Sequence, residues 1–191
     1  MFADLHIHTD FSDGIHSPKE IINRALLANL KKISITDHDI FLGNIEAKNI
    51  VNENNIDLDI ISGVEFSCFQ NEIEFHIIGL FVDFDNLLIN TVIKDMQNKR
   101  IESIKNIIQY LKYKKIALKY NDILMQSKGS IGRPHIGKEL VNKGYAKNIN
   151  EAFDKYLSND LLKDIREPRL PLEKAIYVIN NAGGLSILAH P

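Results

Sequence analysis

The sequence predicts an α/β protein with a largely parallel sheet or barrel and an inserted block of helices. Two patterns indicate this class. Short apolar runs alternate with amphipathic helical stretches in residues 1–86, and helical spacing dominates residues 87–162. Strand and helix patterns return in residues 163–191. The chain has 191 residues, of which 45% are apolar, so it can bury one core that carries an insertion. We therefore expect residues 1–86 and 163–191 to share a core.

The first 86 residues predict strands and helices in alternation. "ADLHIH" is typical of a strand. "SPKEIINRALLANL" predicts a helix, because Ser17 suits the N-cap, Pro18 the first turn and Glu20 completes a capping box. "KISITDHD" predicts the second strand, and a second helix is expected over about 44–54. "DIISGVEFS" and "EFHIIGLFV" predict two more strands, which the short polar gap between them places side by side or in a hairpin.

The block from 87 to 162 is predicted to be helical. One long amphipathic helix is indicated by residues at helical spacing: Ile89, Ile93, Met96, Arg100, Ile104, Ile107 and Leu111. Further helical patterns follow at "YNDILMQS", "HIGKELVNKG" and "NEAFDKYLS". After the block, "PLEKAIYVINNAGG" predicts a helix that Gly183 or Gly184 ends, and "LSILAHP" predicts a last strand.

Composition limits the partners. The formal net charge of −2 argues against a general nucleic-acid surface and favours short substrates over long duplex DNA. Cys68 is the only cysteine, which excludes an internal disulfide and suits a reduced, cytoplasmic protein. The longest apolar runs are far shorter than the roughly 20 residues that cross a membrane, and charged residues near the start interrupt any signal peptide. We expect a cytoplasmic protein with no membrane partner.

Histidines and acids gather where the predicted strands end. Strand side chains alternate between faces, so His6 and His8 share one face. The C-terminal ends of strands in a βα barrel form one rim, and the other candidates lie at such ends or follow them: Asp13, Asp37, His38, Asp39, Glu65, His76 and His190. Histidine with carboxylate and without thiolate suits Mn, Fe or Zn, and more ligands than one ion needs predict a cluster. Such clusters clamp phosphate esters and activate water at neutral pH.

Two residues are expected to lie outside this chemistry. His16 precedes the Ser17 cap in a loop, and we expect it to be solvated. Cys68 has no helix N-terminus or dedicated base beside it, so we expect a small packed residue rather than a nucleophile.

Six motifs, in order, resemble the PHP (polymerase and histidinol phosphatase) superfamily. They are "DLHIHTDFSDG", "ITDHD", "GVEFS", "EFHIIGLFVD", "IGRPHIGKELVNKGY" and "NNAGGLSILAHP". The resemblance implies a distorted, TIM-like (βα)7 barrel that holds two or three ions, with Mn²⁺ expected. The helical block resembles the branch with a small inserted domain. That branch includes 3',5'-nucleoside bisphosphate phosphatases and enzymes that trim RNA from its 5' end.

The resemblance also implies roles for particular residues. The metal ligands would be His6, His8, Asp13, His38, Glu65, His76 and His190. Arg100, Arg133 and His135 would bind substrate phosphate, for which an arginine fork is well shaped. Asp13, His38 and His135 would be catalytic, with His135 able to protonate the leaving oxygen, and Asp37 would orient ligands. Arg100 lies on an apolar stripe and needs a partner. "RPH" also suits a helix start with Pro134 in the first turn.

The family pattern continues beyond "AHP" to a Gly-Ser-Asp-x-His-like motif with two more ligands, whereas this sequence ends at Pro191. We therefore expect a barrel truncated at its C-terminus, which a missing segment or a second chain completes. The leading hypothesis is a metal-dependent phosphoesterase acting on small nucleotides with two phosphates or on 5' ends of short RNA. A histidinol-phosphatase-like enzyme, a non-catalytic metal-binding fragment and a polymerase-associated module remain alternatives, which metal content and substrate preference separate.

Overall fold

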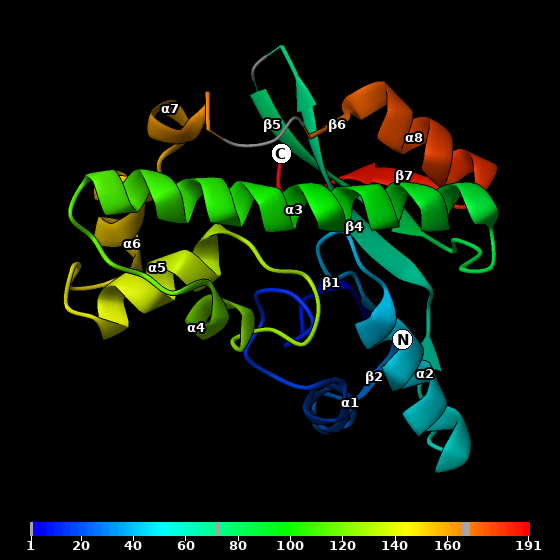
Figure 1. Ribbon diagram of the computed structural model, residues 1–191. Coiled ribbons are helices and arrows are strands. Elements are labelled where there is room, and N and C mark those ends of the chain that lie inside the picture. The colour runs from blue at the N-terminus through cyan, green and yellow to red at the C-terminus, as the bar shows by residue number, and fades with distance from the viewer. Residues whose placement is uncertain (1, 72, 166–168) are drawn as a thin grey trace.

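The computed structural model describes residues 2–71, 73–165 and 169–191. Figure 1 shows how its helices and strands are arranged in space. In chain order these elements are β1 (Phe2–Ile7), α1 (Pro18–Leu27), β2 (Leu30–Ile35), α2 (Leu42–Glu53), β3 (Asp59–Ile60), β4 (Gly63–Gln70), β5 (Ile73–Leu80), α3 (Leu87–Tyr113), α4 (Tyr120–Leu124), α5 (Arg133–Asn142), α6 (Ile149–Ala152), the π-helical turn η1 (Phe153–Leu157), α7 (Asn159–Leu162), β6 (Leu170–Pro171), α8 (Leu172–Asn181) and β7 (Leu185–Leu188).

The first sheet is parallel, in the order β1-β2-β3, and α1 and α2 pack against it. The expected capping box of α1 is present: the Glu20 amide donates to the Ser17 hydroxyl, and the Glu20 carboxylate accepts from the Ser17 amide. The helix ends three residues earlier than the sequence pattern suggested, because Asn29 turns with a φ of 54° and Leu30 already begins β2.

The second sheet has the order β6-β4-β5-β7 and is mixed. The β4–β5 hairpin is antiparallel, as is the β5–β7 pair, whereas β4 and β6 are parallel. The expectation of a largely parallel sheet is therefore wrong for this half, because β4 and β5 follow one another in the sequence and pair in opposite directions. β4 also runs on to Gln70, so Glu65 lies inside a strand and not at its end.

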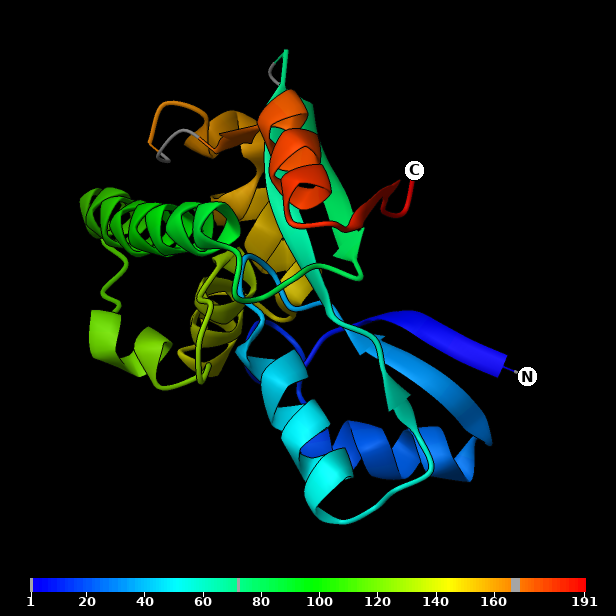
Figure 2. The ribbon, with the colours of Figure 1, turned by 90° about the vertical axis from the view of Figure 1, so that its right-hand side faces the viewer.

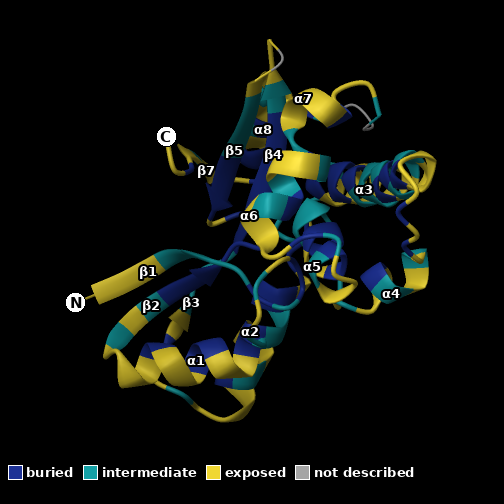
Figure 3. Ribbon diagram, turned by 90° about the vertical axis from the view of Figure 1, so that its left-hand side faces the viewer, coloured by how far each residue is buried: buried dark blue, intermediate teal, exposed yellow. Residues whose placement is uncertain are grey.

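The two sheets meet where the chain leaves β2 and passes beside β4. The amide of Asp39, just beyond β2, donates to the Glu65 carbonyl at 2.8 Å, and His38 pairs with Glu65 in an isolated parallel bridge. Figure 2 shows the two sheets diverging from this junction, with α1 and α2 on one side and α8 on the other. Among the described residues no closed barrel forms, since each sheet ends in separate edge strands. The edge strands β1 and β7 are largely exposed (Figure 3).

The long helix α3 joins two cores. Its N-terminal half, with Ile89 and Met96, packs with β4, β5 and α8. Its C-terminal half, with Ile104 and Leu111, packs with α4 to α7. Arg100 lies between these halves, and Figure 1 shows the helix spanning both groups of elements. The expected helix at "NEAFDKYLS" is instead the short α6 followed by η1. In the described part of the chain, no helix has the length and apolar character to cross a membrane.

Candidate metal centre

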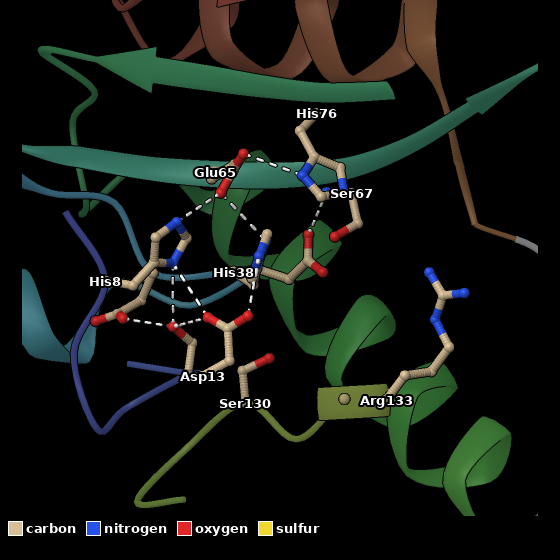
Figure 4. Close-up of polar contacts among 12 residues, drawn as sticks. His8, Asp13, His38, Glu65, Ser67, His76, Ser130 and Arg133 are labelled. Atoms are coloured by element: carbon tan, nitrogen blue, oxygen red, sulfur yellow. Dashed lines mark hydrogen bonds and ion pairs between the residues drawn. The ribbon is translucent and has the colours of Figure 1, made fainter. Parts of the chain in front are cut away.

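One buried carboxylate, that of Glu65, is the centre of the site. Five imidazoles approach it from four segments of the chain, since His6 and His8 share the first, with nitrogen–oxygen distances of 3.0 to 3.3 Å: His6, His8, His38, His76 and His190. Figure 4 shows His8, His38 and His76 pointing toward this carboxylate. Because β1, β2 and β4 come together at the sheet junction, side chains far apart in the sequence share one pocket.

Asp13 extends the cluster on one side. Its two carboxylate oxygens lie 3.5 Å from Nδ1 of His8 and 3.7 Å from Nε2 of His38. Among the described residues, three overlapping groups of side chains can each surround an ion: His6–Glu65–His190, His8–Asp13–His38 and His38–Glu65–His76. Two of these groups share Glu65, whose two carboxylate oxygens would allow it to serve neighbouring ions, whereas a neutral His38 would offer a lone pair to one ion.

Asp37 accepts hydrogen bonds from the turn that carries Asp13. One oxygen of the buried Asp37 carboxylate accepts from the Thr9 amide (2.7 Å) and the Ser12 hydroxyl (2.6 Å), and the other accepts from the Thr9 hydroxyl (2.6 Å). The Ser12 oxygen lies 3.3 Å from Nδ1 of His8. A Cβ on Gly14 would lie 2.5 Å from the His8 carbonyl oxygen, so this tight turn requires glycine. These hydrogen bonds fix Thr9 and Ser12 on either side of the turn, and the expectation that Asp37 orients metal ligands stays a prediction.

The donor set fits divalent ions. Nδ1 of His38, Nδ1 of His76 and Oε2 of Glu65 are buried, and none of them makes a well-aligned hydrogen bond within the described part of the chain. Burial lowers the pKa of His38 to about 4, so its ring is neutral and one of its nitrogens can act as a ligand. Burial alone would raise the pKa of Glu65, but the His76 and His8 imidazoles outweigh it and lower that pKa. The oxygen and nitrogen donors, without thiolate, suit Mn, Fe or Zn.

Arg100 has the partner that its place on the apolar stripe required. Its Nε and Nη2 donate to one oxygen of buried Asp39, at 2.6 and 2.5 Å, and Nη2 also donates to the Ser67 hydroxyl at 2.8 Å. The other Asp39 oxygen accepts from the Ser67 amide. Asp39 therefore fixes the guanidinium of Arg100 beside the cluster, in an open pocket of about 500 Å³ that His38 and His76 also line.

Arg133 and His135 lie in the same pocket, at the start of α5. Arg133 donates to Glu74 (3.1 Å), Asn159 (2.7 Å) and the Leu157 carbonyl (3.2 Å). Both ring nitrogens of His135 contact the main chain: Nε2 donates to the Ser12 carbonyl (2.8 Å), and Nδ1 accepts from the Gly132 amide (3.0 Å). In this arrangement neither nitrogen can protonate a leaving group, which differs from the role expected for His135.

The linker before α5 is tied to the turn that holds Asp13. The Lys128 amide donates to the Asp10 carbonyl (2.8 Å), and the Ser130 amide donates to the Phe11 carbonyl (2.7 Å). Together with the His135–Ser12 bond, these contacts fasten the helical block to the ligand-bearing turn. The block therefore forms one wall of the pocket.

Two sequence expectations about residues outside the centre can be compared directly with the structure. His16 lies in the loop before α1, where it is half-buried and not fully solvated as expected, and it joins none of the described ligand groups. Cys68 is fully buried in the core of the second sheet, and burial raises the pKa of its thiol to about 12.

Sequence reasoning missed several polar residues of the pocket wall, among them Ser67, Glu74 and Arg169. Glu74 could have been found from its position two residues before His76, since strand periodicity places both on one face. Arg169 follows the helical block and carries no local pattern that distinguishes it from a surface arginine.

The PHP domain family model matches residues 4–162. The chain belongs to the PHP domain family. It is 32% identical over 190 residues to the 5'-3' exoribonuclease Rnm of Escherichia coli (strain K12), which covers 98% of this chain and 64% of that relative. It is 30% identical over 190 residues to a 3',5'-nucleoside bisphosphate phosphatase of Chromobacterium violaceum, covering 98% of this chain and 66% of the relative.

A solved structure agrees with the fold. A Bifidobacterium adolescentis protein assigned as a metal-dependent phosphoesterase superposes with a TM-score of 0.89 and 28% identity, over 98% of this chain and 66% of that one. The PHP domain described here thus spans about two thirds of the length of these relatives.

Proposed function

We propose that this PHP domain is part of a metal-dependent phosphoesterase. The observation that carries the proposal is the convergence of five imidazoles and Asp13 around buried Glu65, next to a pocket lined by arginines. Hydrolysis of a phosphate ester requires both features. The reacting phosphoryl group is anionic, and negative charge develops on the leaving oxygen as its bond to phosphorus breaks.

The proposed ligands are His6, His8, Asp13, His38, Glu65, His76 and His190, and the proposed ion is Mn²⁺, with Fe or Zn as alternatives. Divalent ions, when bound, neutralise phosphate charge and lower the pKa of water. The donor chemistry supports this assignment, since imidazole and carboxylate suit these ions and the set contains no thiolate.

The remaining roles belong to side chains of the pocket wall. We propose that Arg100, held by Asp39, and Arg133 contact the phosphate of the substrate, because a planar guanidinium matches phosphate oxygens and stays charged. Asp13 and His38 act as catalytic ligands beside the reacting group. For His135 the hydrogen bonds support a positioning role, which fixes the turn that carries Asp13.

The proposed substrates are small nucleotides with two phosphates or the 5' ends of short RNA. The names of two relatives, a 3',5'-nucleoside bisphosphate phosphatase and a 5'-3' exoribonuclease, support this choice. The net charge of −2 agrees with a short substrate rather than a long duplex.

We also propose the domain organisation that the sequence suggested. Residues 1–86 and 163–191 would belong to one distorted (βα)7 barrel, and residues 87–162 would be an insertion that caps the site. The second apolar core supports an insertion, since its buried residues all lie between Ile104 and Leu162 and pack against one another.

Hydrolysis assays with Mn²⁺ test the function. Phosphate release is measured from a 3',5'-nucleoside bisphosphate, a 5'-phosphorylated short RNA and histidinol phosphate, with a chelator and the His8→Ala variant as controls. The proposal expects release from the nucleotide substrates that both controls abolish. Preference for histidinol phosphate, or release that survives the chelator, would contradict it.

A further inference from the structure

Glu74 connects the proposed metal ligands to the arginines of the pocket. It lies on β5 two residues before His76, so both side chains emerge on the same face of the strand. Its Oε1 is 3.3 Å from Nε2 of His76 and also pairs with Nη1 of Arg169, and its Oε2 is 3.1 Å from Nη2 of Arg133. One carboxylate thus contacts side chains from three separate parts of the chain.

The contact with His76 determines which ring nitrogen faces the cluster. Nδ1 of His76 lies 3.1 Å from Glu65 and points into the centre, whereas Nε2 points to Glu74. A carboxylate that accepts from one imidazole nitrogen places the proton there and leaves the lone pair of the other nitrogen for a metal. Glu74 therefore selects the ring form in which Nδ1 of His76 can be a ligand.

Glu74 also holds two guanidinium cations, those of Arg133 and Arg169, at the wall of the pocket beside the metal ligands. Nη1 of Arg133 donates to Asn159 and to the Leu157 carbonyl. The guanidinium carbon of Arg133 lies 5.6 Å from the centre of the Phe153 ring. Nη2 of Arg133 pairs with Glu74, and Arg169 pairs with the other oxygen of the same carboxylate. A carboxylate and a phosphate offer arginine similar pairs of oxygens, so guanidiniums aimed at Glu74 are also aimed at an anion in the adjoining pocket.

We propose that Glu74 is a positioning residue that aligns both halves of the site, the His76 ring toward the ions and Arg133 with Arg169 toward the substrate phosphate. The inference rests on the proposed phosphoesterase function and adds to it a residue that acts through its neighbours. It predicts that the charge of Glu74 matters for anion binding and that its hydrogen-bond acceptor matters for metal binding.

Calorimetric titrations separate the two halves without relying on turnover. The probes are Mn²⁺ alone, and inorganic phosphate added to Mn²⁺-loaded protein. Glu74→Gln keeps an acceptor oxygen but removes the charge, Glu74→Ala removes both, and Glu53→Gln on the exposed end of α2 is the matched control. We expect Glu74→Ala to weaken Mn²⁺ binding about 10- to 100-fold and Glu74→Gln to weaken it less.

For phosphate, we expect Glu74→Gln to weaken binding about tenfold and the Glu53 control to leave it unchanged. In a background that already carries Arg133→Ala and Arg169→Ala, the same Glu74→Gln change should have less than about a twofold effect, because the residues act together. Tighter phosphate binding in Glu74→Gln would mean that the carboxylate competes with the substrate, and an undiminished effect in the arginine-free background would mean a general structural role. Either result would overturn the arginine half of the proposal, which is that Glu74 aligns Arg133 and Arg169 toward phosphate.

Unchanged Mn²⁺ affinity in Glu74→Ala would overturn the half that concerns His76. Failure of the wild-type protein to bind phosphate would overturn the proposed function and the arginine half with it. The Mn²⁺ titrations would still decide the role of Glu74 at His76, so the two failures can be told apart.

Discussion

The ion pair between Asp39 and Arg100 allows a quantitative prediction. Asp39 is fully buried and the Arg100 side chain is only 18% exposed, and Asp39 is the charged partner of a guanidinium that also donates to Ser67 and the Ile131 carbonyl. Asp39→Asn keeps the shape and tolerates the backbone φ of 53°, but it removes the charge. Removing one partner of a buried pair costs about 3–5 kcal/mol, and the partial exposure of Arg100 favours the lower end.

We therefore expect the free energy of unfolding to fall by about 3 kcal/mol in Asp39→Asn, measured by urea denaturation followed by circular dichroism. The matched control is Asp59→Asn. Asp59 pairs with Lys32 at the surface, where the two side chains are 67% and 40% exposed, so its loss should change stability by less than about 0.5 kcal/mol.

A double-mutant cycle with Arg100→Met isolates the pair. The double variant carries no unpaired charge, so its cost should be smaller than the sum of the two single costs by about 2 kcal/mol. Additive costs, or an Asp39→Asn variant as stable as the Asp59 control, would refute the conclusion that this pair fixes Arg100 in the pocket.

Three further outcomes follow from the same geometry. Arg133→Ala should raise the KM for a phosphate substrate about tenfold while bound metal, measured by elemental analysis, stays at the wild-type level; metal loss would instead indicate a structural role. Cys68 should not react with a thiol reagent until the protein unfolds, because burial raises its pKa to about 12, and rapid reaction of the native protein would argue against that burial. Ser17→Ala should lower the free energy of unfolding by about 1 kcal/mol through loss of the α1 cap and leave metal affinity unchanged, whereas a change in metal affinity would show that α1 acts on the site.

Local patterns predicted the elements well where the signal is short-range. The cap of α1, the long helix α3 and the β4–β5 hairpin depend on residues close in sequence, and each is present in the structure. The antiparallel direction of β7 against β5 depends on how distant segments pack, which no local pattern encodes. The extension of β4 through Cys68 to Gln70 was missed because the polar residues at the hairpin tip resemble a loop.

The gathering of the candidate ligands was predictable for those that follow a strand, because strand ends meet at one edge, whereas Glu65 and His76 lie inside strands. The contacts that arrange the pocket were harder to predict. Glu74, Ser67 and Arg169 act through side-chain hydrogen bonds across elements, and such bonds depend on three-dimensional register. The same holds for His135, whose ring nitrogens turn out to contact the main chain of Ser12 and Gly132.

The binding of Mn²⁺ to wild-type protein and to Glu65 variants tests the central claim most directly. Calorimetry and elemental analysis should show more than one ion per chain in the wild type and almost complete loss in both Glu65→Ala and Glu65→Gln, with circular dichroism confirming that the Gln variant is folded. Glu53→Gln should behave as the wild type. A folded Glu65→Gln protein that binds as many ions as the wild type, with the same affinity, would contradict the assignment of this cluster as a metal centre.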